Sequence, residues 1–577
     1  MQIIRRDCPE VDHLPDNLHP LLKRVYAARD IQEPTQLDYS LSGLHPYGDL
    51  HGIDDAVALL QRVIAAGRRI LIVADFDADG ATACALAVRG LTAMGAQDVR
   101  YVVPNRFEYG YGLSPEIVAV AAEQQPDLIM TVDNGIASVD GVTAARERGM
   151  QVIITDHHLA PQTLPAADAI VNPNLPHDPF PSKYLAGVGV MFYVLIALRV
   201  QLRAQGWFEQ QGLEVPNLAQ WLDLVALGTV ADVVPLDHNN RILVAQGLMR
   251  MRSHSSCAGI RALLTVAGRQ PQQVTAMDLG FCVAPRLNAA GRLTDMTVGI
   301  ECLLTNTDES AKAMARQLDT LNRQRRDLQD SMHEDAEQYV AELRELTETG
   351  DELPSGLCLY REDWHQGLVG LVAARVKDQI HRPVIAFAPA ADGTNALKGS
   401  ARSIPGVHIR DALAAVATRH PHVITKFGGH AMAAGLSLEA TNYEAFAMAF
   451  ADEIDRMLGG EVPVGTILSD GGLEPRELSV RTAEVIARGG PWGQGFPEPV
   501  FDGEFELVER KIVGGRHLSL KLQPPGTNRP IKAIAFGTDD SHWPARVDRV
   551  AAAFRLDIDT YGGRRQLQLM VEHLTPL

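Results

Sequence analysis

The chain has 577 residues, a length that suggests several domains of roughly 100–200 residues each. Hydrophobic residues make up 46% and charged residues 21% of it, which excludes a disordered or collagen-like chain. The net charge of −18 excludes a general basic coat for nucleic acids but not a local basic channel. No apolar run reaches the ~18–20 residues that span a bilayer, and the cysteines have no metal-site or disulfide spacing. We therefore expect a soluble, cytoplasmic protein with no membrane partner.

The first 240 residues divide into an arm and an α/β region. Residues 1–48 are rich in Pro, His and Leu without a clean period, and we expect an N-terminal arm lying on the first domain. From 49 to 240, short apolar strands alternate with helices, which predicts a parallel sheet with helices on both faces. The predicted strands cover residues 69–75, 99–103, 127–133 and 151–156.

The region 241–350 is predicted to be helical and to end in one long amphipathic helix over residues 309–350. Met314, Leu318 and Leu321 belong to an apolar series with a spacing of three or four residues that continues to Leu346. At 1.5 Å per residue, such a helix is about 60 Å long. A dimeric coiled coil is one interpretation of this pattern. An interdomain strut is favoured, because a new α/β segment follows at once.

Two further domains are predicted after the long helix. Residues 351–460 contain short apolar strand candidates with a helix at 367–379 between them, and Gly459-Gly460 is typical of a hinge. Residues 468–577 contain five short strand candidates separated by Gly and Pro turns, which predicts a small β-barrel resembling an OB-fold. Such barrels commonly bind single strands of nucleic acid. The predicted fold class is thus α/β, with a parallel-sheet domain, a long connecting helix, a second α/β domain and a C-terminal barrel.

The most informative stretch follows the first predicted strand and reads Val-Ala-Asp-Phe-Asp-Ala-Asp-Gly from residue 73 to 80. Asp75, Asp77 and Asp79 project to one face while the chain is extended. Carboxylates this close repel one another unless a cation lies between them. An acidic surface turn is the alternative, but the position directly after an apolar strand favours a metal site.

Carboxylates and imidazoles recur at later strand ends and in one apolar segment, as Asp133, Asp156, His157, His158 and Asp232. Ligands of an open parallel sheet bind outside the carboxyl ends of its strands, so these distant residues are expected to converge. Carboxylates with one or two imidazoles and no thiolate suit Mn²⁺ or Mg²⁺. Four or five carboxylates exceed what one ion needs, which points to two divalent cations about 3.5–4 Å apart and to phosphoester hydrolysis.

Competing chemistries lack their motifs. The sequence has no G-x-x-x-x-G-K-[ST] loop for ATP-driven translocation. It has neither the G-x-S-x-G elbow of serine hydrolases nor a G-x-G-x-x-G dinucleotide loop. Metal-dependent phosphoester hydrolysis is the interpretation that the motifs favour.

The motifs resemble those of the DHH phosphoesterase superfamily. Its four motifs are similar to Asp-Phe-Asp-Ala-Asp-Gly at 75–80, Val-Asp-Asn-Gly at 132–135, Asp-His-His at 156–158 and Gly-Thr-Val-Ala-Asp at 228–232. Two later segments, Gly-Ser-Ala-Arg-Ser at 399–403 and Phe-Gly-Gly-His-Ala at 427–431, resemble the DHHA1 domain. The form of the first motif, the long helix and the barrel resemble the RecJ family of bacterial single-strand-specific 5′→3′ DNA exonucleases. The resemblance implies a DHH catalytic domain (49–240), a DHHA1 substrate-binding domain (351–460) and a nucleic-acid-binding barrel (468–577).

The resemblance also implies that two cations are held by Asp75, Asp77, Asp79, Asp133, His157 and Asp232. Asp133 would be shared by both ions and so would be essential for catalysis. Pyrophosphatase-like relatives carry a His where this chain has Val73, so Asp75 is expected to supply that ligand. As further catalytic groups, His158 would face the scissile phosphate and Asp156 would orient an imidazole.

The resemblance places the substrate on the other side of the cleft, at Arg106, Arg286, Ser400, Arg402, Gly429 and His430. These residues would hold the terminal 5′ phosphate and the adjacent phosphates, a task that suits bidentate arginine chemistry. Surface ion pairing is the alternative for Arg106.

The expected function is a metal-dependent exonuclease that degrades single-stranded DNA from the 5′ end in DNA repair and recombination. Expected partners are single-stranded-DNA-binding protein and a RecQ-type helicase. A DHH phosphodiesterase for nanoRNA or cyclic dinucleotides is one alternative, disfavoured because a dinucleotide needs no barrel. A non-catalytic nucleic-acid scaffold is another, disfavoured because the ligand set is complete.

Overall fold

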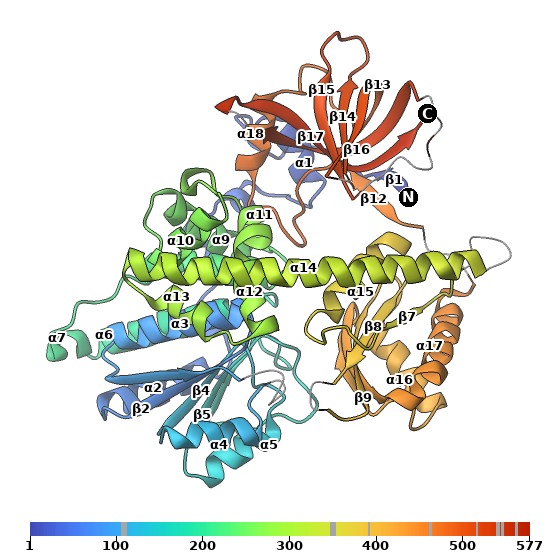
Figure 1. The fold of residues 1–577 in the computed structure, drawn as a ribbon. Helices are drawn as coiled ribbons and strands as arrows, with labels where there is room; N and C mark the ends of the chain where they lie inside the picture. The colour runs from blue at the N-terminus through green and yellow to red at the C-terminus, as the bar shows by residue number, and fades with distance from the viewer. Residues whose placement is uncertain are drawn as a thin grey trace.

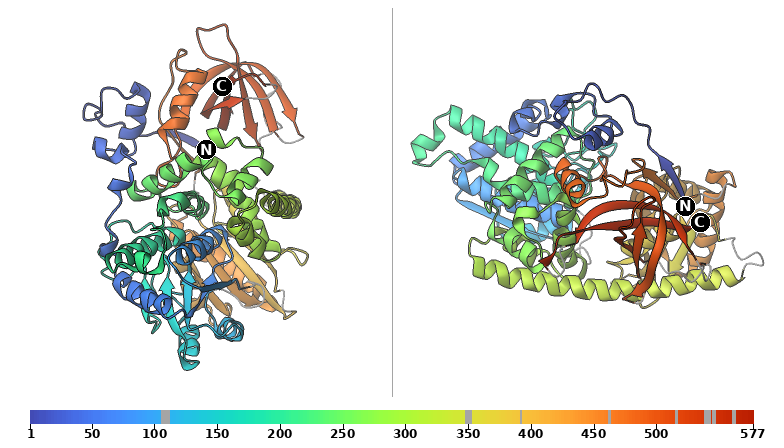
Figure 2. Two further views of the ribbon diagram at one scale, coloured as in Figure 1. Left: turned by 90° about the vertical axis from the view of Figure 1, so that its left-hand side faces the viewer. Right: turned by 90° about the horizontal axis from the view of Figure 1, so that it is seen from above.

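The computed structural model describes residues 1–104, 112–346, 353–390, 393–460, 464–514, 517–537, 543, 547–559 and 563–577. Two α/β domains lie next to each other, one long helix runs across both, and a β-barrel lies on the other side of that helix (Figure 1). The view from above places the barrel over the junction of the two domains (Figure 2). This confirms the predicted fold class.

The first domain is built on five parallel strands in the order β3-β2-β4-β5-β6. All except the edge strand β3 are almost continuous apolar runs, as expected where helices cover both faces of a sheet. The strands are β2 (Arg69–Ala74), β3 (Asp98–Val102), β4 (Leu128–Val132), β5 (Gln151–Thr155) and β6 (Ala169–Val171).

Alternate side chains of these strands enter two separate cores. Ile70 and Ile72 belong to the large core with α2, α3 and α6, whereas Leu71 and Val73 belong to a smaller core with α4 and α5. Within the described chain, α6 alone is long and apolar enough to cross a membrane by length and composition, but 67% of that window is buried in the protein. The helices are α2 (Ile53–Ala65), α3 (Ala78–Ala93), α4 (Pro115–Glu123), α5 (Val139–Glu147) and α6 (Gly187–Ala204).

A helical region links the first domain to the second. It consists of α7 (Trp207–Gln211), α8 (Leu222–Ala231), α9 (His238–Arg252), α10 (Ala258–Val266), α11 (Ala276–Asp278), the π-helical turn η6 (Leu279–Val283), α12 (Ala284–Leu293), α13 (Thr297–Leu304) and α14 (Asp308–Leu346).

The long helix α14 is a strut between the domains. Ala315 and Leu318, near its start, are buried in the core of the first domain. Met332 and Ala336, further along, are buried with α15 (Val369–Ile380) of the second domain. The apolar stripe is therefore covered by its own chain along both halves, as a strut requires and a dimeric coiled coil does not.

The second domain has a mixed sheet in the order β10-β11-β9-β8-β7. Only β7 and β8 pair in parallel, and the other neighbours are antiparallel. Helices α14 and α15 cover one face, and α16 and α17 cover the other. The elements are β7 (Leu357–Tyr360), β8 (Val384–Pro389), β9 (Ala396–Arg402), α16 (Ile409–Arg419), β10 (Lys426–Gly429), β11 (Ala433–Glu439) and α17 (Tyr443–Leu458).

The C-terminal domain is a closed five-stranded barrel in the order β13-β14-β15-β17-β16, with one parallel pair, β15 and β17. Helix α18 packs on β16 and β17. The elements are α18 (Val480–Gly489), β13 (Phe501–Val513), β14 (His517–Gln523), β15 (Ile531–Phe536), β16 (Arg549–Asp559) and β17 (Gln566–Pro576).

The N-terminal arm corrects one expectation in part, because its first strand pairs next to the C-terminal domain, whereas Leu22 and Val25 are buried in the same core as the first domain. Strand β1 (Gln2–Arg5) pairs in parallel with β12 (Thr466–Ser469). After α1 (Pro20–Ala27), Arg29 forms a fully buried ion pair with Asp470, at 2.6 Å. The arm therefore ties the barrel to the rest of the chain. Its later part, with the 3₁₀ turns Pro34–Leu37, Leu41–Gly43 and Tyr47–Asp49, runs down to the first domain (Figure 2).

Candidate metal centre

The first acidic motif forms the sharp turn between β2 and α3. Asp77 is the N-cap of α3, and its Oδ1 accepts the N–H of Gly80 at 3.0 Å. A Cβ at Gly80 would lie 2.5 Å from the carbonyl oxygen of Asp75, so the turn closes only with glycine. Asp75 and Asp79 are buried on either side of this turn. The three carboxylates thus lie together at the carboxyl edge of the sheet.

Asp133 directly follows β4 and is 1% exposed. Its φ of 63° is left-handed, an uncommon conformation for a residue other than glycine and one that is often found at functional sites. The N-terminus of α6 packs against it, because a Cβ at Gly187 would lie 2.4 Å from that of Asp133. The same helix end donates two N–H groups to Asp79, from Gly187 at 2.6 Å and from Val188 at 3.0 Å. Helix α6 therefore positions two of the predicted ligands at once.

The Asp-His-His segment follows β5 and is organised around Asp156. Oδ1 of Asp156 accepts the backbone N–H of His157 at 2.7 Å and lies 2.7 Å from Nδ1 of His158. Its Oδ2 accepts the N–H of Ile136 at 2.9 Å. Asp156 is buried, and these bonds hold the imidazole of His158 and the backbone of His157, which fits the orienting role that the family resemblance implies for one imidazole.

The six predicted ligands come together. Nε2 of His157 lies 3.1 Å from Oδ1 of Asp133 and 3.4 Å from Oδ2 of Asp232. Three sets of side chains each bring possible ligand atoms within 4.8 Å of one another, and Asp133 and His157 each belong to two of the sets. The sets are Asp133, His157 and His158; Asp79, His157 and Asp232; and Asp75, Asp77 and Asp133.

The pKa values of these groups show that negative charge is unfavourable in this buried cluster of carboxylates. Burial, followed by the neighbouring carboxylates, raises the pKa of Asp133 and Asp232 well above the usual range. Burial and the charge of Asp77 raise the pKa of Asp79 to about 7. Burial lowers the pKa of His157 to about 4, so its imidazole is neutral and can offer a lone pair. Several carboxylate oxygens and a neutral imidazole around a common point fit a site for two hard divalent cations.

His158 has the opposite electrostatics. Burial alone would lower its pKa, but the hydrogen bond and charge of Asp156 outweigh burial and raise the pKa to about 9. At neutral pH this ring is the positively charged imidazolium, whereas the adjacent ring of His157, with its centroid 4.5 Å away, is neutral. One of the paired histidines is therefore suited to bind a cation and the other to donate to an anion.

The second domain contributes four of the predicted substrate residues from its antiparallel strands. On β9, Nη1 of Arg402 donates to Oγ of Ser400 at 3.0 Å. A Cβ at Gly370, in the first turn of α15, would lie 2.8 Å from both Nη2 of Arg402 and Oγ of Ser400. The guanidinium and the hydroxyl thus pack against the first turn of α15, and Nη1 of Arg402 also donates to the carbonyl of Ala401, so phosphate binding here stays a prediction. Burial lowers the pKa of Arg402, and within the described residues no ion pair joins it to an acidic side chain.

Gly429 and His430 lie two strands away from Ser400, across β11. Gly429 has a φ of 145°, and a Cβ there would lie 2.5 Å from the carbonyl oxygen of Ala433, so the strand end requires glycine. Burial lowers the pKa of His430, and the charge of His158 lowers it further. The rim of the second domain therefore faces the metal cluster of the first.

The two remaining substrate residues were predicted from loops. Arg106 lies among residues 105–111, outside the described residues. Arg286 is buried in α12, where its Nε and Nη2 lie 2.9 and 2.8 Å from Oδ1 of Asp319 on α14. Its Nη1 donates to the carbonyl of Cys282. This guanidinium joins two helices, and a role in binding substrate stays a prediction.

Sequence reasoning missed the asparagines that hold the motif backbones. Nδ2 of Asn134 donates to the carbonyls of Val73 and Val132, which joins the ends of β2 and β4. Asn174 and Asn172 donate to the carbonyls of His157 and His158, at 2.6 and 2.9 Å. Only Asn134 directly follows a predicted strand, whereas Asn172 follows β6, a strand that the sequence analysis did not predict.

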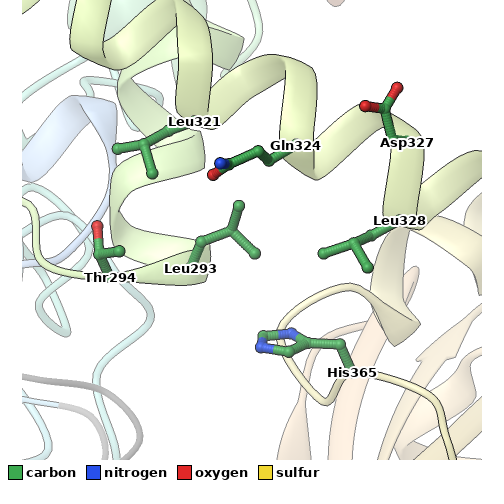
Figure 3. Close-up of a pocket in the computed structure, with 7 residues that line it drawn as sticks. All are labelled: Leu293, Thr294, Leu321, Gln324, Asp327, Leu328 and His365. Carbon is green, nitrogen blue, oxygen red and sulfur yellow. The ribbon is translucent and has the colours of Figure 1, made fainter.

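A pocket of about 460 Å³ contains none of the predicted metal ligands (Figure 3). It opens where the end of α12, α14 and the segment before α15 meet. Leu293, Leu321 and Leu328 form its apolar wall, and His365 approaches from the second domain. The carboxylates of the cluster do not line it, so the predicted chemistry lies outside this cavity.

The comparisons with known proteins agree with this geometry. The DHH family, N-terminal domain, matches residues 69–229, the DHHA1 domain matches 354–456, and the RecJ OB domain matches 469–573.

Similar proteins match along the whole chain. The chain is 52% identical over 577 residues to the single-stranded-DNA-specific exonuclease RecJ of Dickeya dadantii, with 100% of this chain and 99% of the relative covered. The crystal structure of Thermus thermophilus RecJ in complex with Mn²⁺ superposes with a TM-score of 0.79 at 30% identity and covers 100% of this chain and 79% of that one. The corresponding Mg²⁺ complex has a TM-score of 0.74 at 28% identity and covers 100% and 78%. This chain belongs to the RecJ family of single-stranded-DNA-specific exonucleases.

Proposed function

We propose that this protein is a metal-dependent exonuclease that hydrolyses single-stranded DNA from its 5′ end. The observation that carries the proposal is the convergence of Asp75, Asp77, Asp79, Asp133, His157 and Asp232 at one edge of the sheet, opposite the predicted anion site on the second domain. The relatives and solved structures, named as single-stranded-DNA-specific exonucleases and as Mn²⁺ and Mg²⁺ complexes, support both the substrate and the cofactor.

The residues of the first domain would hold the cofactor and the leaving group. Asp77 and Asp133, with Asp75, would bind one cation, and Asp79, Asp133, His157 and Asp232 the second. Two bound Mn²⁺ or Mg²⁺ ions supply an activated water and screen the charge on the phosphate oxygens. His158, protonated and held by Asp156, would donate its proton to the 3′ oxygen that leaves when the P–O3′ bond breaks.

The residues of the second domain would set the polarity. Arg402, Ser400 and the N-terminus of α15 would bind the terminal 5′ phosphate, and Gly429 and His430 would approach the next phosphate. Cleavage of the P–O3′ bond releases a 5′-mononucleotide and leaves a new 5′ phosphate on the strand. The product of one cycle therefore carries the group that the second domain recognises in the next. The barrel would bind the strand beyond the cleft.

The test compares one oligonucleotide labelled at the 5′ end with the same oligonucleotide labelled at the 3′ end, in Mn²⁺. The proposal expects immediate release of labelled mononucleotide from the 5′ label and delayed release from the 3′ label. Duplex DNA, short RNA and a cyclic dinucleotide serve as parallel substrates. Equal rates on duplex DNA, or initial release from the 3′ label, would contradict the proposal.

We also propose a cytoplasmic role in DNA repair and recombination, alongside single-stranded-DNA-binding protein and a RecQ-type helicase. The support is family membership and the substrate chemistry, since both partners expose or hold single strands. Stimulation of nuclease activity on partly duplex DNA by each added protein measures this directly. A nuclease rate that neither added protein changes would exclude both as partners.

A further inference from the structure

Helix α12 contacts the first acidic turn although it lies some 210 positions along the chain. Oδ1 of Asn288 accepts the backbone N–H of Ala78 at 2.8 Å. Ala78 is buried and stands between Asp77 and Asp79 as the first residue of α3. A Cβ at Gly291 would lie 1.8 Å from the carbonyl oxygen of Phe76, so the backbone of α12 also touches the turn directly.

The hydrogen bond completes the N-terminus of α3. The first N–H groups of a helix have no partner within the helix and must find acceptors elsewhere. The N–H of Gly80 is satisfied by Asp77, and that of Ala78 is satisfied by Asn288. Because Ala78 is flanked by two predicted cation ligands, the position of its backbone fixes the direction of both carboxylates.

Helix α12 is itself anchored to two other elements. Arg286 is held to Asp319 of the long helix α14 by two donor atoms. Arg292 donates to the carbonyl of Gly367, in the second domain, at 3.2 Å. Asn288 therefore extends from a helix braced against both the strut and the second domain.

We propose that Asn288 is a positioning residue of the metal centre, whose side-chain oxygen holds the turn carrying Asp77 and Asp79 in the geometry that binds the cations. The inference rests on the metal site of the proposed function. Asn288 acts through the backbone of Ala78 and binds neither cation. Partners that orient the ligands of a metal commonly change its affinity by about 10–100-fold when they are removed.

The experiment measures Mn²⁺ affinity of the full-length protein by electron paramagnetic resonance, without substrate. Asn288→Leu keeps the volume and removes the acceptor, and it should lower the Mn²⁺ affinity about tenfold or more. Asn288→Asp keeps the acceptor and should bind Mn²⁺ at least as tightly as the wild type. Thr294→Val, which removes a hydroxyl at the end of the same helix, is the matched control and should leave the affinity unchanged.

Wild-type affinity in Asn288→Leu would overturn the inference, and so would equal losses in the Leu and Asp variants. Circular dichroism reports whether each variant folds, and Asn288→Ala replaces Asn288→Leu if the larger apolar side chain prevents folding. With saturating Mn²⁺, activity of Asn288→Leu should recover while its KM for DNA stays that of the wild type. Failure of the proposed function is distinguishable, because Mn²⁺ affinity is measured without DNA.

Discussion

The two sides of the cleft carry opposite charge. The first domain gathers buried carboxylates at the ends of parallel strands, where burial raises their pKa values and only cations or protons offset their charge. The second domain presents Arg402 and Ser400 beside a helix N-terminus, on antiparallel strands whose glycines let the backbone come close. The first side is incomplete without cations and the second without an anion. A phosphodiester bound with divalent ions completes both.

The largest effect should come from Asp133→Asn, which breaks the carboxylate side. Asp133 belongs to two of the three ligand sets, and loss of metal-assisted charge stabilisation worth several kcal/mol corresponds to roughly a thousandfold loss of rate. Because the substitution removes a repelled, buried charge, the melting temperature of the metal-free protein should stay equal or rise. The exposed Asp140→Asn, on α5, is the matched control. Cleavage above about a tenth of the wild-type rate at saturating Mn²⁺ would refute the shared-ligand assignment.

Arg402→Ala removes the guanidinium that is proposed to bind the 5′ phosphate, and it should reduce activity less than Asp133→Asn does. A hydrogen-bonded charge pair contributes about 1.5–3 kcal/mol, so KM on 5′-phosphorylated single strands should rise about 10–100-fold. Mn²⁺ affinity should not change, because the ligands belong to the first domain. Arg456→Ala, an exposed arginine on α17 of the same domain, is the control.

The same variant on substrates with a 5′ hydroxyl sharpens this test. Without the phosphate, Arg402 has no anion to bind, and the difference between mutant and wild type should shrink. The two proteins and two substrates form a thermodynamic cycle. Additive losses would mean that Arg402 does not recognise the 5′ phosphate.

The smallest effect concerns pH. Burial and the charge of Asp77 raise the pKa of Asp79 from 3.8 to about 7, so below that pH a cation must displace a proton. Mn²⁺ affinity should therefore fall as pH drops below 7, by about tenfold per unit for each proton displaced. For the metal-free protein the sign is reversed: the folded state holds this proton more tightly, so stability falls as pH rises from about 4 through 7. Calorimetry from about pH 4 to 8 measures both trends, and a pH-independent Mn²⁺ affinity would contradict the assignment of Asp79.

Most of the metal site could be predicted from the sequence because its ligands are marked by a local pattern, their position just after apolar strands. Asp75 and Asp133 directly follow apolar strands and His157 is the second residue after one, so all three could be placed before any tertiary contact was known. The ion pairs, the close contacts of glycines and the hydrogen bonds of the asparagines could not be predicted from the sequence. The motif Gly-Val-Gly-Val at the start of α6 looks like any apolar helix, yet Gly187 packs against Asp133.

Long-range contacts explain the other differences. The arm was placed on the first domain because nothing in residues 1–48 indicates a partner more than 450 positions away, where β1 pairs with β12. Arg286 was assigned to the substrate from the family resemblance, and its ion pair with Asp319 on the long helix could not be predicted from the sequence. Both contacts depend on which elements become neighbours in three dimensions. The spacing of apolar residues along the sequence does not indicate this.

The central claim is that the buried carboxylates and His157 form one two-ion centre. Its most direct test is anomalous diffraction from crystals of the protein grown in Mn²⁺. The account predicts two Mn²⁺ peaks about 3.5–4 Å apart at the carboxyl edge of the sheet, with Asp133 bound to both. A single peak, or peaks that do not share Asp133, would contradict it.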